Sequence, residues 1–518
     1  MAEQGFRKWI IVITVVSAAV IELIDTSIVN VAITNMSASL GATIEDVAWV
    51  ITAYAIANVI IIPMTSFLGG LFGRRNYYVF SILLFTLASF FCGNSHTLPE
   101  LVFFRFMQGI GGGALLSTSQ SILFDTFTIE ERPFASAIFG LGVVIGPTIG
   151  PTLGGWIVDN FTWPWIFFVN IPIGITAAVL SWTFVKEPKD ERKVGAIDWT
   201  GILLLIVGIS SLQYVLERGE TEDWFDSRTI VLLSATAVIG LILFVWRELT
   251  TKHPVVELHV LKSRTLAFCA FLTFIIGFGL FSSVFVIPVF AQRLLGYTAM
   301  QTGLLLLPGA IVTLFVLPFV GKIQQRGFPP QLMIFFGFAL TALYTFMLSR
   351  ISLQAGWWDF FGPLVIRGIG LPLCFIPITT LAVSGLSPRD IPQGVALNNM
   401  MRQLGGSFGI AIVNTYLAHR MQINRVGLIA HVTQYGSATQ LRLNTMIQSF
   451  MAKGETIAVA QQQATAALEG AVLRQTMVKS YLDVFVFVTI FFVMCLPLIL
   501  TIRKGKAPIS AEAMSGAH

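Results

Sequence analysis

At residues 142–155 the chain reads Gly142-Val143-Val144-Ile145-Gly146-Pro147-Thr148-Ile149-Gly150-Pro151-Thr152-Leu153-Gly154-Gly155. This run lies inside a long apolar segment without a charged residue, and its glycines and prolines would break a helix in water. In a bilayer, neighbouring helices satisfy the freed backbone groups, and glycine lets a second backbone approach closely. The run therefore predicts a bent, tightly packed membrane helix.

The composition excludes an ordinary soluble protein. Of 518 residues, 55% are hydrophobic and 11% are charged, whereas soluble domains carry about 25% charged residues. A chain of this kind is expected to be a polytopic membrane protein that lies in a lipid bilayer.

The net charge of +5 and the pI near 9.0 do not indicate nucleic-acid binding. Basic residues fall in short clusters between apolar runs. Because the predicted spans alternate in direction, these clusters all lie on one face of the membrane, which is the positive-inside pattern. The loops near Glu45, Ser95 and Asp159 carry no lysine or arginine. The N- and C-termini of this multi-pass protein are therefore expected to be cytoplasmic.

The four cysteines lie within apolar segments and show no metal-ligand spacing, so we expect neither a disulfide framework nor a metal site. The chain also contains no phosphate-binding GxxxxGK[ST] motif and no nucleophile paired with a base. We therefore expect a transporter without a cofactor and not an enzyme.

A membrane span needs about 20 mostly apolar residues to cross about 30 Å of hydrocarbon. The sequence holds fourteen such runs, at residues 10–33, 47–71, 77–95, 98–124, 134–158, 164–185, 198–216, 229–249, 266–291, 300–321, 331–349, 360–385, 393–417 and 480–502. The predicted fold class is all-α.

An internal repeat relates spans 1–6 to spans 9–14. Span 4 holds Arg105 in an RFMQGIG sequence, and span 12 holds Arg367 in a similar RGIG sequence. Transporters are commonly built from such repeated halves. We predict an N-terminal six-helix bundle at 1–190, an inserted pair of membrane helices at 191–262 and a C-terminal six-helix bundle at 263–518.

The segment 418–479 between the last two spans has little continuous hydrophobicity and is rich in Gln, Ala and Thr. Its Ala/Gln-rich part favours helix. We expect helical structure that projects from the outer, periplasmic face, either as a docking surface or only as a cover.

Charged residues within spans are costly to bury, and each is a candidate functional residue. Glu22 and Asp25 share one face of span 1, and Arg105 lies in span 4. Asp25 lies about 12 Å and Arg105 about 10 Å from the outer ends of their helices, at 1.5 Å per residue. Asp25 and Arg105 can therefore meet, as a static salt bridge or as a proton-coupling pair. Glu22 is a candidate second protonation site or substrate contact.

Other polar residues of the spans are candidates for a substrate cavity. Arg402 and Arg367 can each attract an anionic substrate, neutralise a carboxylate or bind helix carbonyls. Uncharged polar groups often hydrogen-bond neighbouring helices, and methionine adapts to many apolar shapes. The predicted cavity residues are Asn30, Gln108, Asn398, Arg402, Arg367 and Met401.

Several motifs together resemble those of the EmrB-like, fourteen-helix drug:proton antiporters of the major facilitator superfamily. The matching stretches are residues 24–33 of span 1, the RxxQG sequence within 101–113, the GxxxGPxxGPxLGG run of 142–155 and residues 163–174 at the start of span 6. The resemblance extends over both predicted bundles.

This resemblance implies two bundles that alternate access, with Asp25 and Arg105 in proton coupling. It also implies a conformational hinge that favours export, formed by Gly142, Gly146, Pro147, Gly150, Pro151, Gly154 and Gly155. The alternative is that this run is only a helix-packing groove. EmrB-like pumps work with a periplasmic membrane-fusion adaptor and an outer-membrane channel, which implies the same partners and a location in a bacterial inner membrane here.

Three positions depart from the pattern. Gly70 stands where an acidic or polar residue is usual after span 2, Thr34 stands where proline is common, and Pro164 stands where arginine is frequent. The first departure casts doubt on a charge latch between the bundles.

The sequence thus predicts a proton-driven multidrug antiporter that exports hydrophobic or weakly acidic toxic compounds. The alternative is a facilitator-type exporter of one specific metabolite, lipid or siderophore.

Overall fold

The computed structural model describes residues 5–187, 197–433 and 435–500, and the elements in these ranges are helices. The helices are α1 (Gly5–Leu40), α2 (Ile44–Val47), α3 (Trp49–Phe72), α4 (Arg74–Gly93), α5 (Leu98–Thr126), α6 (Arg132–Asn160), α7 (Trp165–Phe168), α8 (Asn170–Phe184), α9 (Trp199–Arg218), α10 (Arg228–Thr250), α11 (Arg264–Leu294), α12 (Ala299–Gln325), α13 (Pro330–Leu348), α14 (Trp357–Ser384), α15 (Ile391–Ile429), α16 (Ser437–Met451) and α17 (Ile457–Leu500). The predicted boundary at 190 and 191 and the predicted end of the last span at 502 lie outside the described residues.

Twelve helices of the described ranges are long and apolar enough to cross a membrane. The long helices α5 and α15 are not among them, because polar side chains such as Arg105 and Arg402 lower their hydropathy. Both nevertheless lie within the helical body, where α5 packs against α3 and α15 packs against α11. The predicted all-α membrane fold is confirmed, and fourteen spans are compatible with it.

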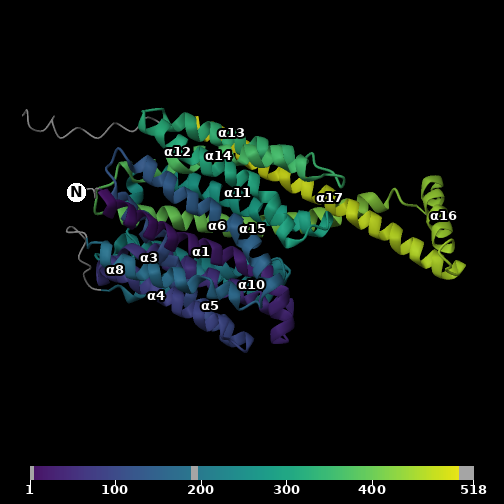
Figure 1. Ribbon diagram of the computed structural model, residues 1–518, viewed down its shortest axis with the longest axis horizontal. Helices are drawn as coiled ribbons and strands as arrows, with labels where there is room; N and C mark the ends of the chain where they lie inside the picture. Colours follow the sequence, from purple (N-terminus) through teal and green to yellow (C-terminus); the bar gives the residue numbers. More distant parts are fainter. Residues whose placement is uncertain (1–4, 188–196, 434, 501–518) are drawn as a thin grey trace, which may run out of the picture.

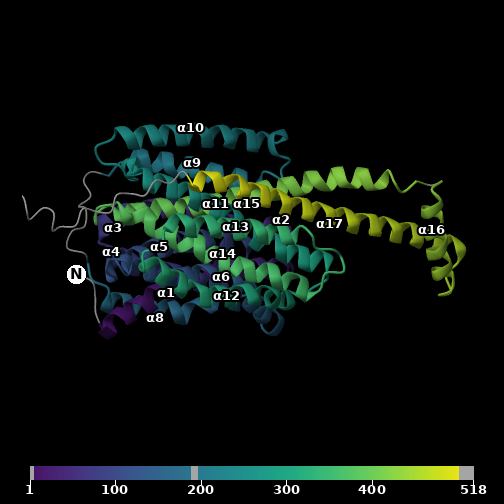
Figure 2. The ribbon, with the colours of Figure 1, turned by 90° about the horizontal axis from the view of Figure 1, so that it is seen from above.

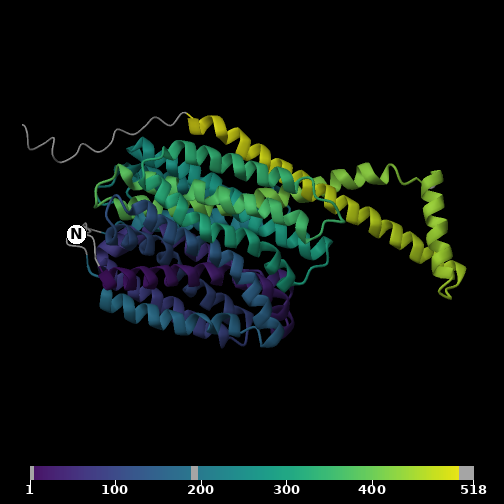
Figure 3. The same cartoon turned by 45° about the horizontal axis from the view of Figure 1, so that its top comes forward.

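The helices pack as two sets that share a long seam (Figures 1 and 3). In the first set α1 packs against α6, α5 and α8, and α5 packs against α3 and α4. In the second set α11 packs against α15 and α14, and α13 packs against α14 and α17. The sets meet where α6 contacts α12 and where α15 contacts α3 and α5.

The glycine-rich run lies in α6 and packs against α1. An added Cβ at Gly146 would come 2.5 Å from the Cβ of Leu23, and one at Gly150 would overlap the side chain of Ser27. The absence of side chains at these positions lets α6 lie directly against the helix that carries Glu22 and Asp25. The run thus forms a helix-packing groove, and its additional role as a hinge stays a prediction.

The helices α9 and α10 form a hairpin on one side of the body, with α10 outermost (Figure 2). The hairpin packs through α9 against α3 and α15, one helix from each set. Arg247 of α10 donates to Asp198 at the start of α9 over 2.9 Å. This ion pair ties the two helices together where the hairpin joins the rest of the chain.

Residues 418–479 are largely helical and extend away from the body, at the end opposite the N-terminus (Figure 1). Predicted span 393–417 lies within the longer helix α15, and the described part of predicted span 480–502 lies within the longer helix α17. Hydropathy marks only the apolar part of a helix, whereas the Ala- and Gln-rich continuation is helical by propensity. Asp483 of α17 accepts hydrogen bonds from Arg420 and Asn424 of α15, which joins the two helices near the base of the projection.

Candidate functional site

Asp25 of α1 and Arg105 of α5 form a buried ion pair. Arg105 Nη1 donates to Asp25 Oδ2 over 2.6 Å, and the two side chains are 1% and 0% exposed, respectively. The depth estimate from the sequence correctly placed the two groups at one level. Removal of either partner would leave an uncompensated charge in the interior, which costs about 3–5 kcal/mol in buried pairs.

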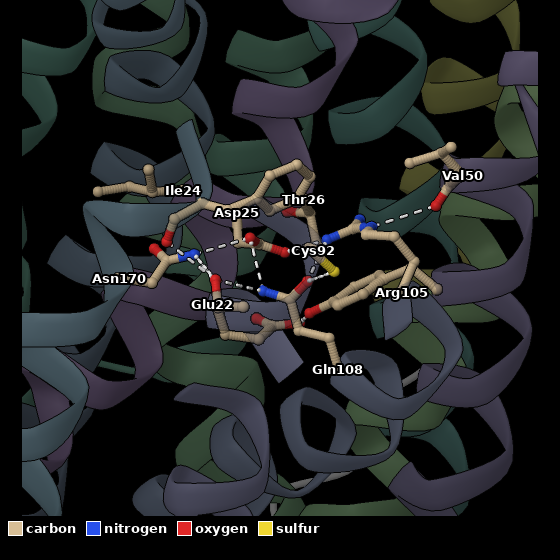
Figure 4. A network of polar contacts seen from close by, with 12 residues as sticks. Glu22, Ile24, Asp25, Thr26, Val50, Cys92, Arg105, Gln108 and Asn170 are labelled. Atoms are coloured by element: carbon tan, nitrogen blue, oxygen red, sulfur yellow. Dashed lines mark hydrogen bonds and ion pairs between the residues drawn. The ribbon is translucent and has the colours of Figure 1, made fainter. Parts of the chain in front are cut away.

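Asp25 is also held by two uncharged donors (Figure 4). Its Oδ1 accepts from Gln108 Nε2 over 2.9 Å and from Asn170 Nδ2 over 2.8 Å. The same two amide groups donate to Ser89 Oγ, which donates in turn to the carbonyl of Phe167. Helices α1, α4, α5 and α8 thus supply one connected network around the carboxylate.

Arg105 is positioned by groups other than its counter-ion. Its Nε donates to the carbonyl of Val50 over 3.2 Å, and its Nη1 also donates to Gln108 Oε1 over 2.8 Å. The guanidinium lies over the ring of Tyr54, 4.1 Å from the ring centre. A planar cation on an aromatic face is stabilised by the ring electrons. The orientation of Arg105 therefore depends on α3 as well as on Asp25.

Glu22 occupies a second polar site beside the first. Its Oε1 accepts from Asn58 Nδ2 over 2.9 Å and from the Tyr54 hydroxyl over 3.3 Å. Its Oε2 is buried and has no hydrogen-bond partner within the part of the chain that the structure describes. A buried charged carboxylate is costly unless its oxygens are satisfied. Glu22 therefore has an oxygen free to take up a proton or contact a ligand.

The two predicted arginines of the second set are also buried. Arg402 lies on α15, which packs against α3 and α5, and its charge attracts that of Glu22 from the first set. Arg367 of α14 lies over the ring of Tyr344, 6.0 Å from the ring centre. Arg402 thus interacts electrostatically with Glu22 of α1, whereas Arg367 lies against an aromatic ring of α13.

The remaining predicted cavity residues are dispersed. Asn30 is exposed and donates to the carbonyl of Thr26, and Met401 is half-buried. Asn398 accepts from the hydroxyl of Thr273 on α11 over 2.8 Å. Gln108 belongs to the Asp25 network. A shared cavity for these residues stays a prediction.

The sequence did not single out Tyr54 or Ser89. Asn58 and Asn170 each hydrogen-bond a neighbouring helix, as uncharged polar groups in spans often do. An apolar helix such as α3 gives no indication that its tyrosine contacts a carboxylate of one helix and a guanidinium of another. Only the packing of α1, α3 and α5 places these side chains in contact.

The sequence matches the Major Facilitator Superfamily over residues 15–410. The chain belongs to this superfamily. Among its relatives, the multidrug export protein EmrB of Escherichia coli K12 is 31% identical over 493 residues, which cover 93% of each chain. The fatty acid resistance protein FarB of Neisseria gonorrhoeae is 30% identical, again over 93% of each chain.

The fold agrees with solved structures of the superfamily. The crystal structure of the human organic anion transporter MFSD10 (TETRAN) aligns with a TM-score of 0.57 and 12% identity, and the alignment covers 94% of this chain and 100% of that one. This similarity concerns the fold alone. The family match and the sequence relatives identify an EmrB-like multi-pass membrane transporter of the Major Facilitator Superfamily, with small molecules as its substrates, and not an enzyme.

Proposed function

We propose that this transporter is a proton-driven multidrug exporter of hydrophobic or weakly acidic toxic compounds. The observation that carries this proposal is the buried pair of Asp25 and Arg105, because an acid that can lose its counter-ion when helices move can bind and release a proton. The relatives named for multidrug export and for fatty acid resistance support a lipophilic cargo.

In this mechanism the two helix sets rock about the seam between α6 and α12. In one arrangement the guanidinium of Arg105 stays on Asp25. In the other, a shift of α1 against α5 within the first set accompanies the rocking and separates the two groups, so that Asp25 takes up a proton from the outer side. Cargo moves outward in exchange for inward proton flow. Glu22 and Arg402 lie beside this path and are the proposed cargo contacts, together with the predicted residues Asn398 and Met401.

The basic clusters of the sequence support cytoplasmic N- and C-termini in a bacterial inner membrane. The helices at 418–479 would then project into the periplasm. Their size and exposure suit docking of a membrane-fusion adaptor, which would lead to an outer-membrane channel. If this is right, replacing residues 431–456 with a short glycine linker will abolish export from cells and leave transport in vesicles unchanged.

The proposed function is tested by reconstituting the purified protein into lipid vesicles. Vesicles with an imposed pH gradient should show proton flux on addition of several unrelated lipophilic drugs. The Asp25→Asn variant should lose this flux, by about tenfold or more, and still bind drug. Asp483→Asn is the matched control, since it breaks the ion pair with Arg420 at the base of the projection and not at the proposed coupling site.

Two outcomes would change the proposal. Proton flux with a single metabolite or fatty acid, and with none of the drugs, would favour the narrow exporter of one metabolite, lipid or siderophore. Wild-type flux and pH dependence in Asp25→Asn would refute the assignment of this carboxylate to proton coupling.

A further inference from the structure

Tyr54 contacts Glu22 of α1 and also Arg105, the counter-ion of Asp25. The side chain is 3% exposed and lies on α3. Its hydroxyl donates to Glu22 Oε1 over 3.3 Å, while its ring lies beneath the guanidinium of Arg105. Through Arg105 the ring is one contact away from Asp25. One aromatic residue thus joins the carboxylate with an unpartnered oxygen to the ion pair.

The position of Tyr54 is built by two glycines of α5, the helix that also carries Arg105. An added Cβ at Gly112 would come 2.5 Å from the Tyr54 hydroxyl oxygen and 3.2 Å from its ring carbon Cζ. An added Cβ at Gly109 would come 2.6 Å from the Tyr54 carbonyl oxygen. Any larger residue at either position would displace the tyrosine. The close approach of α3 to α5 therefore sets the Tyr54 ring against Arg105 and its hydroxyl against Glu22.

We propose that Tyr54 is the positioning residue that connects the two carboxylates of α1, since its hydroxyl holds Glu22 while its ring supports the guanidinium that pairs with Asp25. The inference rests on the proposed proton-driven export. It adds a route by which the charge on Glu22 affects the ion pair.

The route follows from the chemistry of the two contacts. A charged carboxylate is a stronger acceptor than a neutral carboxyl group, so the hydroxyl of Tyr54 holds a charged Glu22 more firmly. When Glu22 takes up a proton or contacts cargo, this restraint on the tyrosine weakens. A shift of the ring then moves the aromatic surface that supports the guanidinium of Arg105. A change at Glu22 is thereby passed to Asp25 without direct contact between the carboxylates.

The pH dependence of this device involves all titratable and charged groups around Tyr54. The groups that act on Tyr54 itself are Glu22 and Asp25 of α1 and Arg105 of α5. These in turn face the thiol of Cys92 on α4 and Arg402 of α15. A change of pH profile in one variant does not identify the group that titrates. The test therefore changes the tyrosine alone, in two separable ways.

The variant Tyr54→Phe keeps the ring and removes the hydroxyl, while Tyr54→Leu removes both. Drug affinity of the purified protein is measured in nanodiscs as a function of pH, with no gradient. We expect Tyr54→Phe to displace the half-maximal pH of drug binding by about half a unit or more, because a hydrogen bond to a charged group is lost. In vesicles, Tyr54→Leu should also lower the drug-driven proton flux about tenfold, because the support of Arg105 is lost.

The matched control is Tyr78→Phe. Tyr78 is fully buried in α4, and its hydroxyl is 2.6 Å from Ser119 Oγ, away from the carboxylates. This control removes the same atom from a comparable site, so a merely structural effect of a lost hydroxyl would appear in both variants. We expect Tyr78→Phe to leave the pH profile unchanged.

A second variant keeps Tyr54 in the sequence and displaces its hydroxyl. Gly112→Ala adds a methyl group against the Tyr54 hydroxyl, and should reproduce the displaced pH profile of Tyr54→Phe. The inference is overturned if Tyr54→Phe and Gly112→Ala both keep the wild-type profile, or if Tyr78→Phe shows the same displacement. A different result would contradict the proposed function, namely the absence of drug-driven proton flux in vesicles that contain the wild-type protein.

Discussion

The side-chain amide of Asn399 donates to Gln120 Oε1 over 3.0 Å and to Ser117 Oγ over 3.3 Å. These hydrogen bonds join α15 to α5, and therefore one helix set to the other. They lie near the C-terminal end of α5 and the N-terminal end of α15. An uncharged contact thus links the two helix sets at this seam.

Replacing Asn399 with alanine should favour the arrangement in which the sets separate at this end. Two neutral hydrogen bonds contribute about 1–3 kcal/mol together, which corresponds to a shift in population of about fivefold or more. Hydrogen exchange of residues 117–121 is the measurement, and faster exchange is expected. Thr489→Val, which breaks a contact with Thr345 within the second set, should not change exchange there.

The close contact of α6 with α1 predicts the effect of bulk at Gly146. Leucine at this position would meet Leu23 and push away the helix that carries Asp25, and overpacking of this kind costs about 1–3 kcal/mol or more. We expect a lower melting temperature and loss of drug-driven proton flux in Gly146→Leu.

Gly470 of α17 provides the contrast, since an added Cβ there has no neighbour within 4 Å. Gly470→Ala should be neutral or stabilising by up to about 1 kcal/mol, because alanine favours the helix. Equal stability and export in Gly146→Leu and the wild type would contradict the packing argument.

Arg105→Lys tests whether charge alone is sufficient at the ion pair. Lysine keeps the positive charge but lacks the planar group that also binds Val50 and Gln108 and lies on Tyr54. Each buried acceptor left unpaired costs about 1–3 kcal/mol. We expect drug-driven proton flux to fall about tenfold, and near-normal flux would show that the network around the charge is dispensable.

The hairpin offers a pH test at Asp198, which caps α9 and lies just before the first residue of that apolar helix. Burial acts to raise the pKa of Asp198, but hydrogen bonds from Arg247 and from the backbone N–H of Gly201 outweigh it, so this pKa lies below its ordinary value. A lowered carboxyl pKa stabilises the fold above the ordinary value of about 3.9, and the stabilisation is lost as the pH falls through the lowered pKa.

The variant Arg247→Gln should therefore open the first turn of α9 more often at neutral pH, by a small amount, because solvent screens a partly exposed ion pair. The difference from the wild type should shrink as the pH falls below about 4. Hydrogen exchange of residues 199–203 measures this. Arg228→Gln is the control, because Arg228 lies at the exposed start of α10, the helix that carries Arg247. If the difference in exchange between Arg247→Gln and the wild type grew at low pH, the pKa of Asp198 would not be lowered as argued.

Much of the candidate site could be predicted from the sequence. A charge in an apolar span is conspicuous because its burial is costly, which identified Asp25, Arg105 and Glu22, and the fixed rise of a helix gave the matching depths of Asp25 and Arg105. The partners of these residues could not be predicted in the same way. Tyr54 and Ser89 are unremarkable in an apolar helix, and only the neighbouring helices decide which way they face.

The sequence alone therefore determined that the chain is a helical membrane transporter, where most of its helices cross the bilayer, and which charges lie inside them, because the energies of transfer into lipid depend on composition along the chain. The tertiary structure decided that Gln108 and Asn170 complete the ion pair, that Tyr54 joins Glu22 to Arg105, and that α15 and α17 continue beyond the body. These relations depend on helix rotation and contact between distant segments, which residue spacing within one helix does not specify.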